Sequence, residues 1–310
     1  LELGNDKIGD STFIKVGDVD ILIDAGSRKN SAETIENFMK TKMTDDKIEY
    51  VIATHAHEDH IAGFVGSSTY GGIFDHYKVG TLIQFARTDS TTKLYSDYCE
   101  KVEALKAAGT TVLKADECVN HPFTLADKIT LEVLDQKFYH QSASTENNYS
   151  VCTMLTQGDN HYLFTGDLEK AAEESLVKLD LDEDGNHIKL THCELFKGGH
   201  HGSETSNNDV LLSVITPDTV CICTCCGSTE YTSDAAKIFP AQVVCDRIAK
   251  YTDKIYVTAS VIDGEYAPMN GNITFKCVDG VTYEVHGSNN DTLLKDTDWF
   301  KNNRAWNGSE

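Results

Sequence analysis

Four side chains that could bind a metal lie within one short segment, THAHEDH, which ends at His60. The apolar run just before the segment predicts a buried strand, so that these side chains stand at a strand end. Neutral imidazole and carboxylate groups are ligands that zinc and similar divalent ions accept. His55 and His57 can bind one ion, while Asp59 and His60 can face a second. A polar loop that is rich in histidine by chance is the alternative.

Two further segments place similar groups at predicted strand ends. Asp167 follows a glycine in FTGD, and its two carboxylate oxygens could each face one cation. His200 and His201 follow another predicted strand in KGGHHGS, where the glycines let the backbone and a ligand approach closely. A solvated turn would explain either segment alone. The three segments together predict a metal centre.

The elements that must position these side chains alternate between strands and helices. Apolar alternation and turn signals predict strands over residues 12–16, 20–24, 50–53, 79–85, 129–134, 150–156, 162–165, 193–197, 220–225, 273–277 and 282–285. Helices are predicted to begin at Ser31 and His60 and to cover residues 91–108, 169–179 and 241–250. This order indicates mixed sheets covered by outer helices, which is compatible with an α/β/β/α sandwich. Periodicity alone does not favour that arrangement over other α/β folds.

Composition limits the domain organisation and the partners. The chain of 310 residues has only 4 prolines, which favours one domain, residues 1–287, with a C-terminal extension, residues 288–310, packed on it. Acidic residues outnumber basic ones by 49 to 27, which gives a net charge of −22. Such a charge repels nucleic acid at long range, so a nucleic-acid partner is disfavoured, although bound metal ions can reverse the local field.

The chain has no apolar run near the ~20 residues that cross a membrane, so we expect no membrane span. Several of the 10 cysteines lie in apolar, strand-like runs, where free thiols are expected. A reducing compartment and a cytoplasmic location are therefore the simpler interpretation. Because the chain begins at Leu1 and not at Met, export after removal of a leader stays open. The sequence indicates no oligomeric state.

The chain resembles the metallo-β-lactamase superfamily. Within it, the resemblance is to the metallo-β-lactamase-like domain of the ComEC family of competence proteins and to the catalytic domain of bacterial phosphorylcholine esterase. The motifs that carry it are GDS from Gly9, IDAG from Ile23, THAHEDHIAG from Thr54, ENNYS from Glu146, FTGDLE from Phe164 and KGGHHGSETS from Lys197. The resemblance implies an αββα sandwich of two mixed sheets with outer helices, and a two-metal hydrolase site.

The resemblance also implies a role for each side chain of the cluster. The implied ligands are His55 and His57 for the first ion, Asp59, His60 and His201 for the second, and Asp167 between them. His200 would then face the substrate phosphate or the leaving group, with the opposite order of the two histidines left open. Asp24 and Asp10 would lie behind the ligands and orient imidazole rings.

One motif departs from the superfamily pattern. Many members have a further histidine between the first cluster and the Gly-Asp motif, where this chain has Glu146-Asn147-Asn148. His140 is near in sequence but lies outside the matching motif. The first ion would therefore have a more open shell, and manganese becomes as acceptable as zinc. Asn148 could hydrogen-bond a phosphate oxygen.

These features predict a metal-dependent hydrolase, first of all a phosphodiesterase that acts on a small or surface-attached phosphoester. Two divalent ions, Zn or Mn, about 3.5–4 Å apart would share a water, lower its pKa and present hydroxide for in-line attack. The predicted catalytic residues are Asp59, Asp167, His200 and Asn148. The alternatives are hydrolysis of a lactone, lactam or thioester by the same hydroxide, and a non-catalytic relative in which metal only holds a binding surface.

Overall fold

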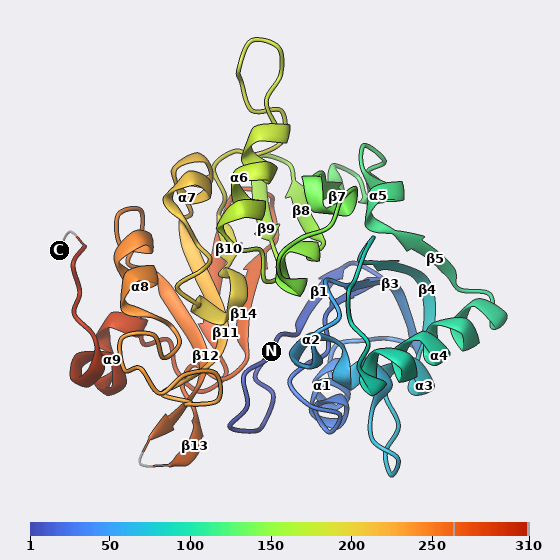
Figure 1. Cartoon of the computed structure of the whole chain (residues 1–310), viewed down its shortest axis with the longest axis horizontal. Coiled ribbons are helices and arrows are strands. Elements are labelled where there is room, and N and C mark those ends of the chain that lie inside the picture. The colour runs from blue at the N-terminus through green and yellow to red at the C-terminus, as the bar shows by residue number, and fades with distance from the viewer. Residues whose placement is uncertain (263, 309–310) are drawn as a thin grey trace.

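The computed structural model describes residues 1–262 and 264–308, and its N-terminal part forms a five-stranded sheet (Figure 1). β1 and β2 pair as an antiparallel hairpin, and the strands that follow are parallel to β2. The strands lie in chain order, β1 (Thr12–Val16), β2 (Val19–Ile23), β3 (Lys47–Ala53), β4 (Lys78–Gln84) and β5 (Thr111–Lys114).

The second sheet has eight strands in the order β13-β12-β11-β10-β9-β8-β7-β6. Its four central strands, β9 to β12, run parallel, and the outer strands are antiparallel to their neighbours. The bounds are β6 (Phe123–Ala126), β7 (Ile129–Leu134), β8 (Cys152–Gln157), β9 (Asn160–Phe164), β10 (Leu195–Lys197), β11 (Thr219–Cys226), β12 (Ile255–Ile262) and β13 (Glu265–Pro268). A separate antiparallel ribbon consists of β14 (Ile273–Cys277) and β15 (Tyr283–Gly287).

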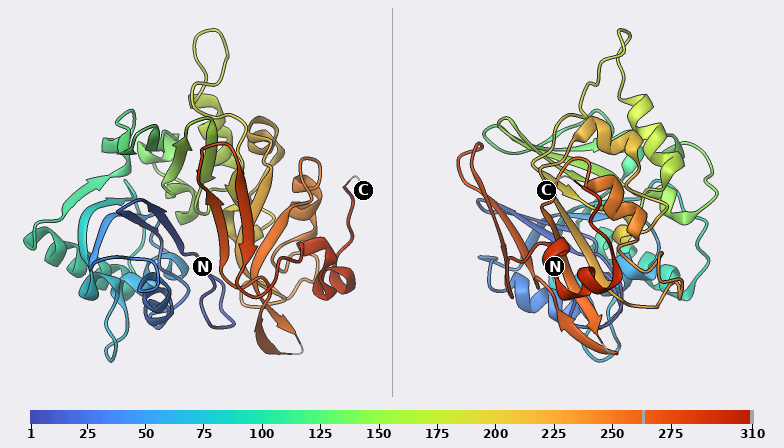
Figure 2. Two further views of the ribbon diagram at one scale, coloured as in Figure 1. Left: turned by 180° about the vertical axis from the view of Figure 1, so that it is seen from behind. Right: turned by 90° about the vertical axis from the view of Figure 1, so that its left-hand side faces the viewer.

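Helices cover the outer face of each sheet, which gives four layers (Figures 1 and 2). The five-stranded sheet carries α1 (Ser31–Met39), α2 (Glu58–Val65), α3 (Ile73–His76) and α4 (Lys93–Ala107), and the short α5 (Ala115–Cys118) follows β5. The eight-stranded sheet carries α6 (Lys170–Leu179), α7 (Asp209–Ile215), α8 (Gln242–Ile248) and α9 (Asp298–Asn303). Short 3₁₀ turns lie at Lys137–Tyr139, Glu146–Tyr149, Gly199–Gly202 and Leu294–Asp296.

Buried apolar side chains join the layers. One core cluster combines the first sheet and its helices with inner-face residues of the second sheet, such as Leu131 and Tyr162. A second cluster fills the space between the eight-stranded sheet and α6 to α9. The αββα sandwich of two mixed sheets is therefore confirmed.

Most predicted elements are present, and the differences have local causes. Helix α2 begins at Glu58, two residues before the predicted start, because His57 has extended dihedral angles and acts as the N-cap. The predictions omitted several elements, among them β5, β6, α7, β12 and β13. All of these except β12 have four to seven residues, too few for a periodic pattern to stand out. In β12, Thr258 and Ser260 interrupt the apolar run, yet both are buried.

The C-terminal residues lie against the eight-stranded sheet. Leu294, Trp299 and Phe300 are buried in the second core cluster. We propose that residues 288–310 are an extension packed on the main domain. Within the described part of the chain, no helix combines the length and apolarity that crossing a membrane requires.

Candidate metal centre

The first half of the site is built where β2 and β3 end. The loop after β2 and the first turn of α2 make direct backbone contact, since Ala25 N donates to the carbonyl of His60 at 2.8 Å. Asp10 N donates to the carbonyl of Asp59 at 3.0 Å. Gly26 permits this approach, because a Cβ at that position would overlap the carbonyl group of Asp59. The backbone of three loops therefore fixes where Asp59 and His60 point.

The second half of the site is built where β9 and β10 end. Asp167 follows Gly166, whose φ of 54° lies in the left-handed region that glycine adopts easily. His200 and His201 have φ values of 50° and 53°, which cost free energy for residues with a Cβ and persist only where neighbours hold them. The side chain of Asn207 supplies such support, because it bonds both the N–H and the carbonyl of the preceding glycine, Gly199, at 2.8 and 2.9 Å.

Four predicted ligands from both halves form one buried group. Asp59, His60, Asp167 and His201 each offer a ligand atom within 4.8 Å of the others. The Oδ2 atom of Asp167 lies 3.1 Å from His60 Nε2 and 3.4 Å from His201 Nε2. His201 Nε2 also lies 3.4 Å from Asp59 Oδ2. These distances place imidazole and carboxylate groups around one small volume.

The two remaining predicted ligands lie beside this group. His55 Nε2 and His57 Nδ1 are 3.0 Å apart, and His55 Nε2 is 3.8 Å from Asp167 Oδ2. Asp167 therefore lies near both His55 and His60, whose ring centroids are 4.1 Å apart. The structure brings all six predicted ligands together, while their binding of metal stays a prediction.

Hydrogen bonds behind the cluster fix the imidazole rings. The Nδ1 atom of His201 lies 3.0 Å from the carbonyl oxygen of Cys223, which can only accept, so Nδ1 carries a hydrogen. The Nδ1 atom of His60 lies 2.7 Å from Asp24 Oδ2 in the same way. Asp24 also accepts from the N–H and the hydroxyl of Thr54, at 2.8 and 2.7 Å. In the neutral rings, the Nε2 lone pairs then face the cluster.

Charge within the cluster is strongly perturbed. Burial lowers the pKa of His60, but the carboxylates of Asp167 and Asp24 raise it more, so that the pKa lies well above its ordinary value. Burial also lowers the pKa of His201, and Asp167 and Asp10 outweigh that effect. Burial raises the pKa of Asp167, yet the neighbouring histidines hold it well below its ordinary value. The buried carboxylates thus favour positive charge at this place.

Burial has the opposite result at His55. Burial and the nearby His60 hold the pKa of His55 well below its ordinary value, so this ring is neutral near pH 7. A neutral imidazole is the form that binds a metal ion.

His200 lies at the edge of the cluster, 3.8 Å from Asp167 Oδ2. Its Nδ1 faces the Thr205 hydroxyl at 3.0 Å, and its Nε2 faces Asn147 Nδ2 at 3.3 Å. Burial lowers the pKa of this histidine as well. This position fits the predicted division, in which His201 is a ligand and His200 faces the substrate.

The asparagine pair differs from the sequence prediction. Asn148, the predicted catalytic residue, is buried, and its side-chain oxygen accepts from the backbone N–H of Glu169 at 3.1 Å. Its neighbour Asn147 is the residue that contacts His200. Both asparagine side chains of this 3₁₀ turn bond Glu169, but only Asn147 also reaches His200, which the motif alone does not specify.

Sequence reasoning missed one residue of the site. The hydroxyl of Tyr231 donates to Asp59 Oδ2 at 2.7 Å, and its ring stacks on Phe239 with centroids 5.9 Å apart. Tyr231 lies far from every motif in sequence, so no local signal marks it. His140, which the sequence left outside the motif, is exposed and pairs with Asp135 at 3.0 Å.

The residues present fit a divalent cation. The donor set of imidazoles and carboxylates suits zinc or manganese. Among the described residues, the buried Oδ1 atom of Asp167 has no hydrogen-bond partner. Such an atom is costly unless another group or an ion satisfies it. This orphaned oxygen and the inward-facing ring nitrogens of His60 and His201 together indicate a place for positive charge.

Comparisons with known proteins give one family and several distant structures. The family model described as the metallo-beta-lactamase superfamily matches residues 4–68. No curated protein matches the chain.

Solved structures that resemble the chain share little sequence with it. A mutant metallo-beta-lactamase from Cronobacter sakazakii is 17% identical over 54% of this chain and 60% of its own, with a TM-score of 0.34. Zn²⁺-bound PqqB from Methylobacterium extorquens is 13% identical over 62% of this chain and 57% of its own, with a TM-score of 0.35.

A candidate metal-dependent hydrolase from Parabacteroides distasonis is 12% identical over 80% of this chain and 87% of its own, with a TM-score of 0.38. The family match contains the whole THAHEDH segment and the loops that contact it. The metallo-beta-lactamase superfamily model thus matches the N-terminal part of this chain, and the αββα layers agree with that fold.

Proposed function

We propose that the protein is a metal-dependent hydrolase of phosphodiesters. The superfamily match over residues 4–68 supports a hydrolase, and the buried His/Asp cluster supports a site for divalent metal. The observation that carries the proposal is the position of Asp167, whose carboxylate lies between two histidine-containing groups and has an unsatisfied oxygen.

We assign the first ion to His55 and His57 and the second to Asp59, His60 and His201, with Asp167 between them. Two ions, when bound, would lower the pKa of a water molecule and offset negative charge on the phosphoryl group. The protein's own contribution is to hold the ligands in place before substrate binds. Asp24 and the Cys223 carbonyl provide this by fixing the rings of His60 and His201.

Two side chains beside the cluster suit a phosphate. His200 and Asn147 lie next to each other at the cluster's edge, and an imidazole or amide N–H there could donate to a phosphoryl oxygen or to the leaving group. The net charge of −22 favours a small phosphodiester over a nucleic-acid polymer.

The experiment combines metal analysis with a substrate panel. Purified protein with added Mn²⁺ or Zn²⁺ should hydrolyse bis-p-nitrophenyl phosphate, and it should do so faster than a lactone or nitrocefin. Asp167→Ala should lose metal and reduce turnover about a thousandfold or more. Asp159→Ala, on the exposed turn before β9, is the matched control and should keep both metal binding and turnover.

Full activity of the Asp167→Ala variant would refute the role of this carboxylate. Turnover of a lactone or of nitrocefin without phosphodiester turnover would replace the proposed substrate class. Metal binding without any turnover would favour a non-catalytic relative.

A further inference from the structure

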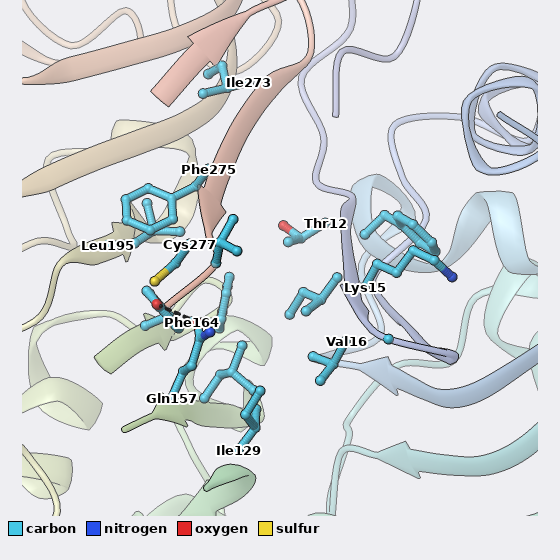
Figure 3. Close-up of a pocket in the computed structure, with 16 residues that line it drawn as sticks. Thr12, Lys15, Val16, Ile129, Gln157, Phe164, Leu195, Ile273, Phe275 and Cys277 are labelled. Atoms are coloured by element: carbon cyan, nitrogen blue, oxygen red, sulfur yellow. Dashed lines mark hydrogen bonds between the residues drawn. The ribbon is translucent and has the colours of Figure 1, made fainter. Parts of the chain in front are cut away.

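A cavity lies between the two sheets, apart from the metal centre (Figure 3). One wall is the β1 strand, from which Thr12 and Val16 point into the gap. The opposite wall comes from the eight-stranded sheet and from β14, and it includes Leu195, Phe275 and Cys277. The cavity has a volume of about 370 Å³, and an adjoining one that shares much of its lining has about 530 Å³.

Many of the residues that line this gap are apolar, although Thr12, Lys15 and Gln157 also line it. Alternation along β14 directs Phe275 and Cys277 inward and leaves Thr274 and Lys276 exposed. Phe275 packs edge-on against Tyr162 of the eight-stranded sheet, with ring centroids 5.4 Å apart. Volumes of this size with mainly apolar walls are typical of small-molecule sites. The volume and the apolar lining residues of the two adjoining cavities are compatible with an aliphatic chain.

Positive charge lines the adjoining cavity. Lys15, Lys42 and Lys276 are exposed residues of its lining. Lys15 is paired with Asp20 at 2.9 Å. Across residues 1–262 and 264–308, neither Lys42 nor Lys276 has a carboxylate within 4.0 Å, although Lys42 lies over the ring of Phe38. Two uncompensated ammonium groups beside an apolar gap stand out in a protein with a net charge of −22.

We propose that this gap binds a single-chain anionic amphiphile, a long-chain carboxylate, with its tail between β1 and β14 and its head near Lys42 and Lys276. The apolar walls exclude water from the tail, while the two ammonium groups attract the carboxylate. An uncharged chain would satisfy only the walls, and a small anion would satisfy only the lysines. This proposal is independent of the proposed hydrolase activity.

The test measures the binding of dodecanoate, below its micellar concentration, to the metal-loaded protein by isothermal titration calorimetry. One molecule should bind each chain. The double variant Lys42→Gln/Lys276→Gln should weaken binding about tenfold. Lys178→Gln, at an exposed position on α6 outside the lining, is the matched control and should leave the affinity unchanged.

A second variant distinguishes the gap from the metal centre, where a carboxylate could also bind. Val16→Phe adds volume inside the gap and should abolish binding of dodecanoate, with circular dichroism confirming the fold. Bound dodecanoate should also protect Cys277 from alkylation by iodoacetamide, while Cys99 on α4 keeps its reactivity.

Three results would overturn the proposal. The first is the absence of saturable binding. The second is binding that the folded Val16→Phe variant retains, since the molecule would then lie elsewhere. The third is an affinity for dodecanol or for acetate that equals the affinity for dodecanoate. Equal binding of dodecanol would show that the carboxylate is not recognised, and equal binding of acetate would show that the aliphatic tail is not recognised.

Discussion

The segment before α2 and the segment after β10 both supply buried histidines to the cluster, yet their backbones are held differently. The carbonyls of Asp59 and His60 accept backbone N–H groups from two neighbouring loops. The turn at His200 and His201 has a backbone bond from His200 N to the Gly166 carbonyl at 3.1 Å, but it also depends on the side chain of Asn207, which bonds the glycine before them. Backbone bonds to two neighbouring loops therefore hold the first turn of α2, whereas the histidine turn relies in part on a side chain that a single substitution can remove.

A buried carboxylate, Glu173, lies behind the histidine turn. Glu173 on α6 accepts from the backbone N–H groups of Asn207 and Asn208, at 2.7 and 3.0 Å, and from the side chain of Asn208. This buried carboxylate thus positions the residue that supports the histidine turn. The contact between Gly26 and the first turn of α2 depends instead on close approach of the two backbones.

The largest effect on stability is expected at Gly26, where the loop after β2 contacts the backbone of α2. Gly26→Ala forces the loop away from the first turn of α2, because the added Cβ overlaps the Asp59 carbonyl group. We expect the free energy of unfolding to fall by about 3 kcal/mol, as measured by urea denaturation. Gly17→Asn is the control, since that position has open space and asparagine tolerates its positive φ. Equal stability of the Gly26→Ala variant and the wild type would contradict the steric argument.

A pH-dependent effect on stability is expected at Glu173, which supports the histidine turn. Burial outweighs the hydrogen bonds of Glu173 and raises its pKa from 4.5 to about 7. The folded protein therefore holds a proton that the unfolded chain releases near pH 4.5, so stability falls as the pH rises from 4.5 to 7. The loss is roughly 3 kcal/mol.

The measurement compares unfolding free energies of the wild type and Glu173→Gln across that pH range. Glutamine does not titrate, so the variant should gain stability relative to the wild type as the pH rises. Glu174→Gln, at the exposed neighbouring position, should follow the wild type. Parallel pH profiles for the Glu173→Gln variant and the wild type would show that the carboxylate is ionised throughout.

A smaller effect is expected behind the first half of the cluster. Asp24→Asn replaces the acceptor of the His60 Nδ1 hydrogen by an amide that can also donate. The ring then loses its fixed orientation, and metal affinity should fall roughly 10- to 100-fold. Competition with a chromogenic chelator measures this affinity. Asp18→Asn in the exposed β1–β2 turn is the control, and an unchanged affinity in Asp24→Asn would exclude the orienting role.

The smallest effect is expected at Tyr231, on the side of the site that the sequence did not predict. Tyr231→Phe removes one hydrogen bond to Asp59 and keeps the stacking on Phe239. We expect about a fivefold loss of metal affinity without a loss of stability. Tyr266→Phe is the matched control, because the Tyr266 hydroxyl has no hydrogen-bond partner among the described residues. A loss as large as that of Asp24→Asn would mean that Tyr231 orients Asp59 as strongly as Asp24 orients His60.

The same contrast explains what the sequence could predict. His55, His57, Asp59 and His60 lie within one strand–loop–helix unit, so a local pattern places them together. Asp167 and His201 follow recognisable strand ends, and the order of parallel strands brings those ends to the same edge. The convergence of these side chains could therefore be inferred from the sequence, whereas the αββα layers follow from the family resemblance, because periodicity alone does not favour them over other α/β folds.

Details that depend on side-chain direction or on distant packing could not be inferred. The choice between Asn147 and Asn148 depends on the rotation of a short 3₁₀ turn. The hydrogen bond from Tyr231 to Asp59 joins residues 172 positions apart, and no sequence pattern near Tyr231 predicts it. Short elements such as β5 and α7 form because the neighbouring layers stabilise them, and local propensity alone did not mark them.

The Nε2 atoms of His60 and His201 face each other at 3.3 Å across 141 positions of the chain. A cation between them would cross-link the two sheets, so that ion binding and folding would share one equilibrium. Each tenfold rise in free metal above the dissociation constant would then add about 1.4 kcal/mol to the stability of the folded protein. The concentration of free metal around the protein would thereby influence how long each molecule stays folded.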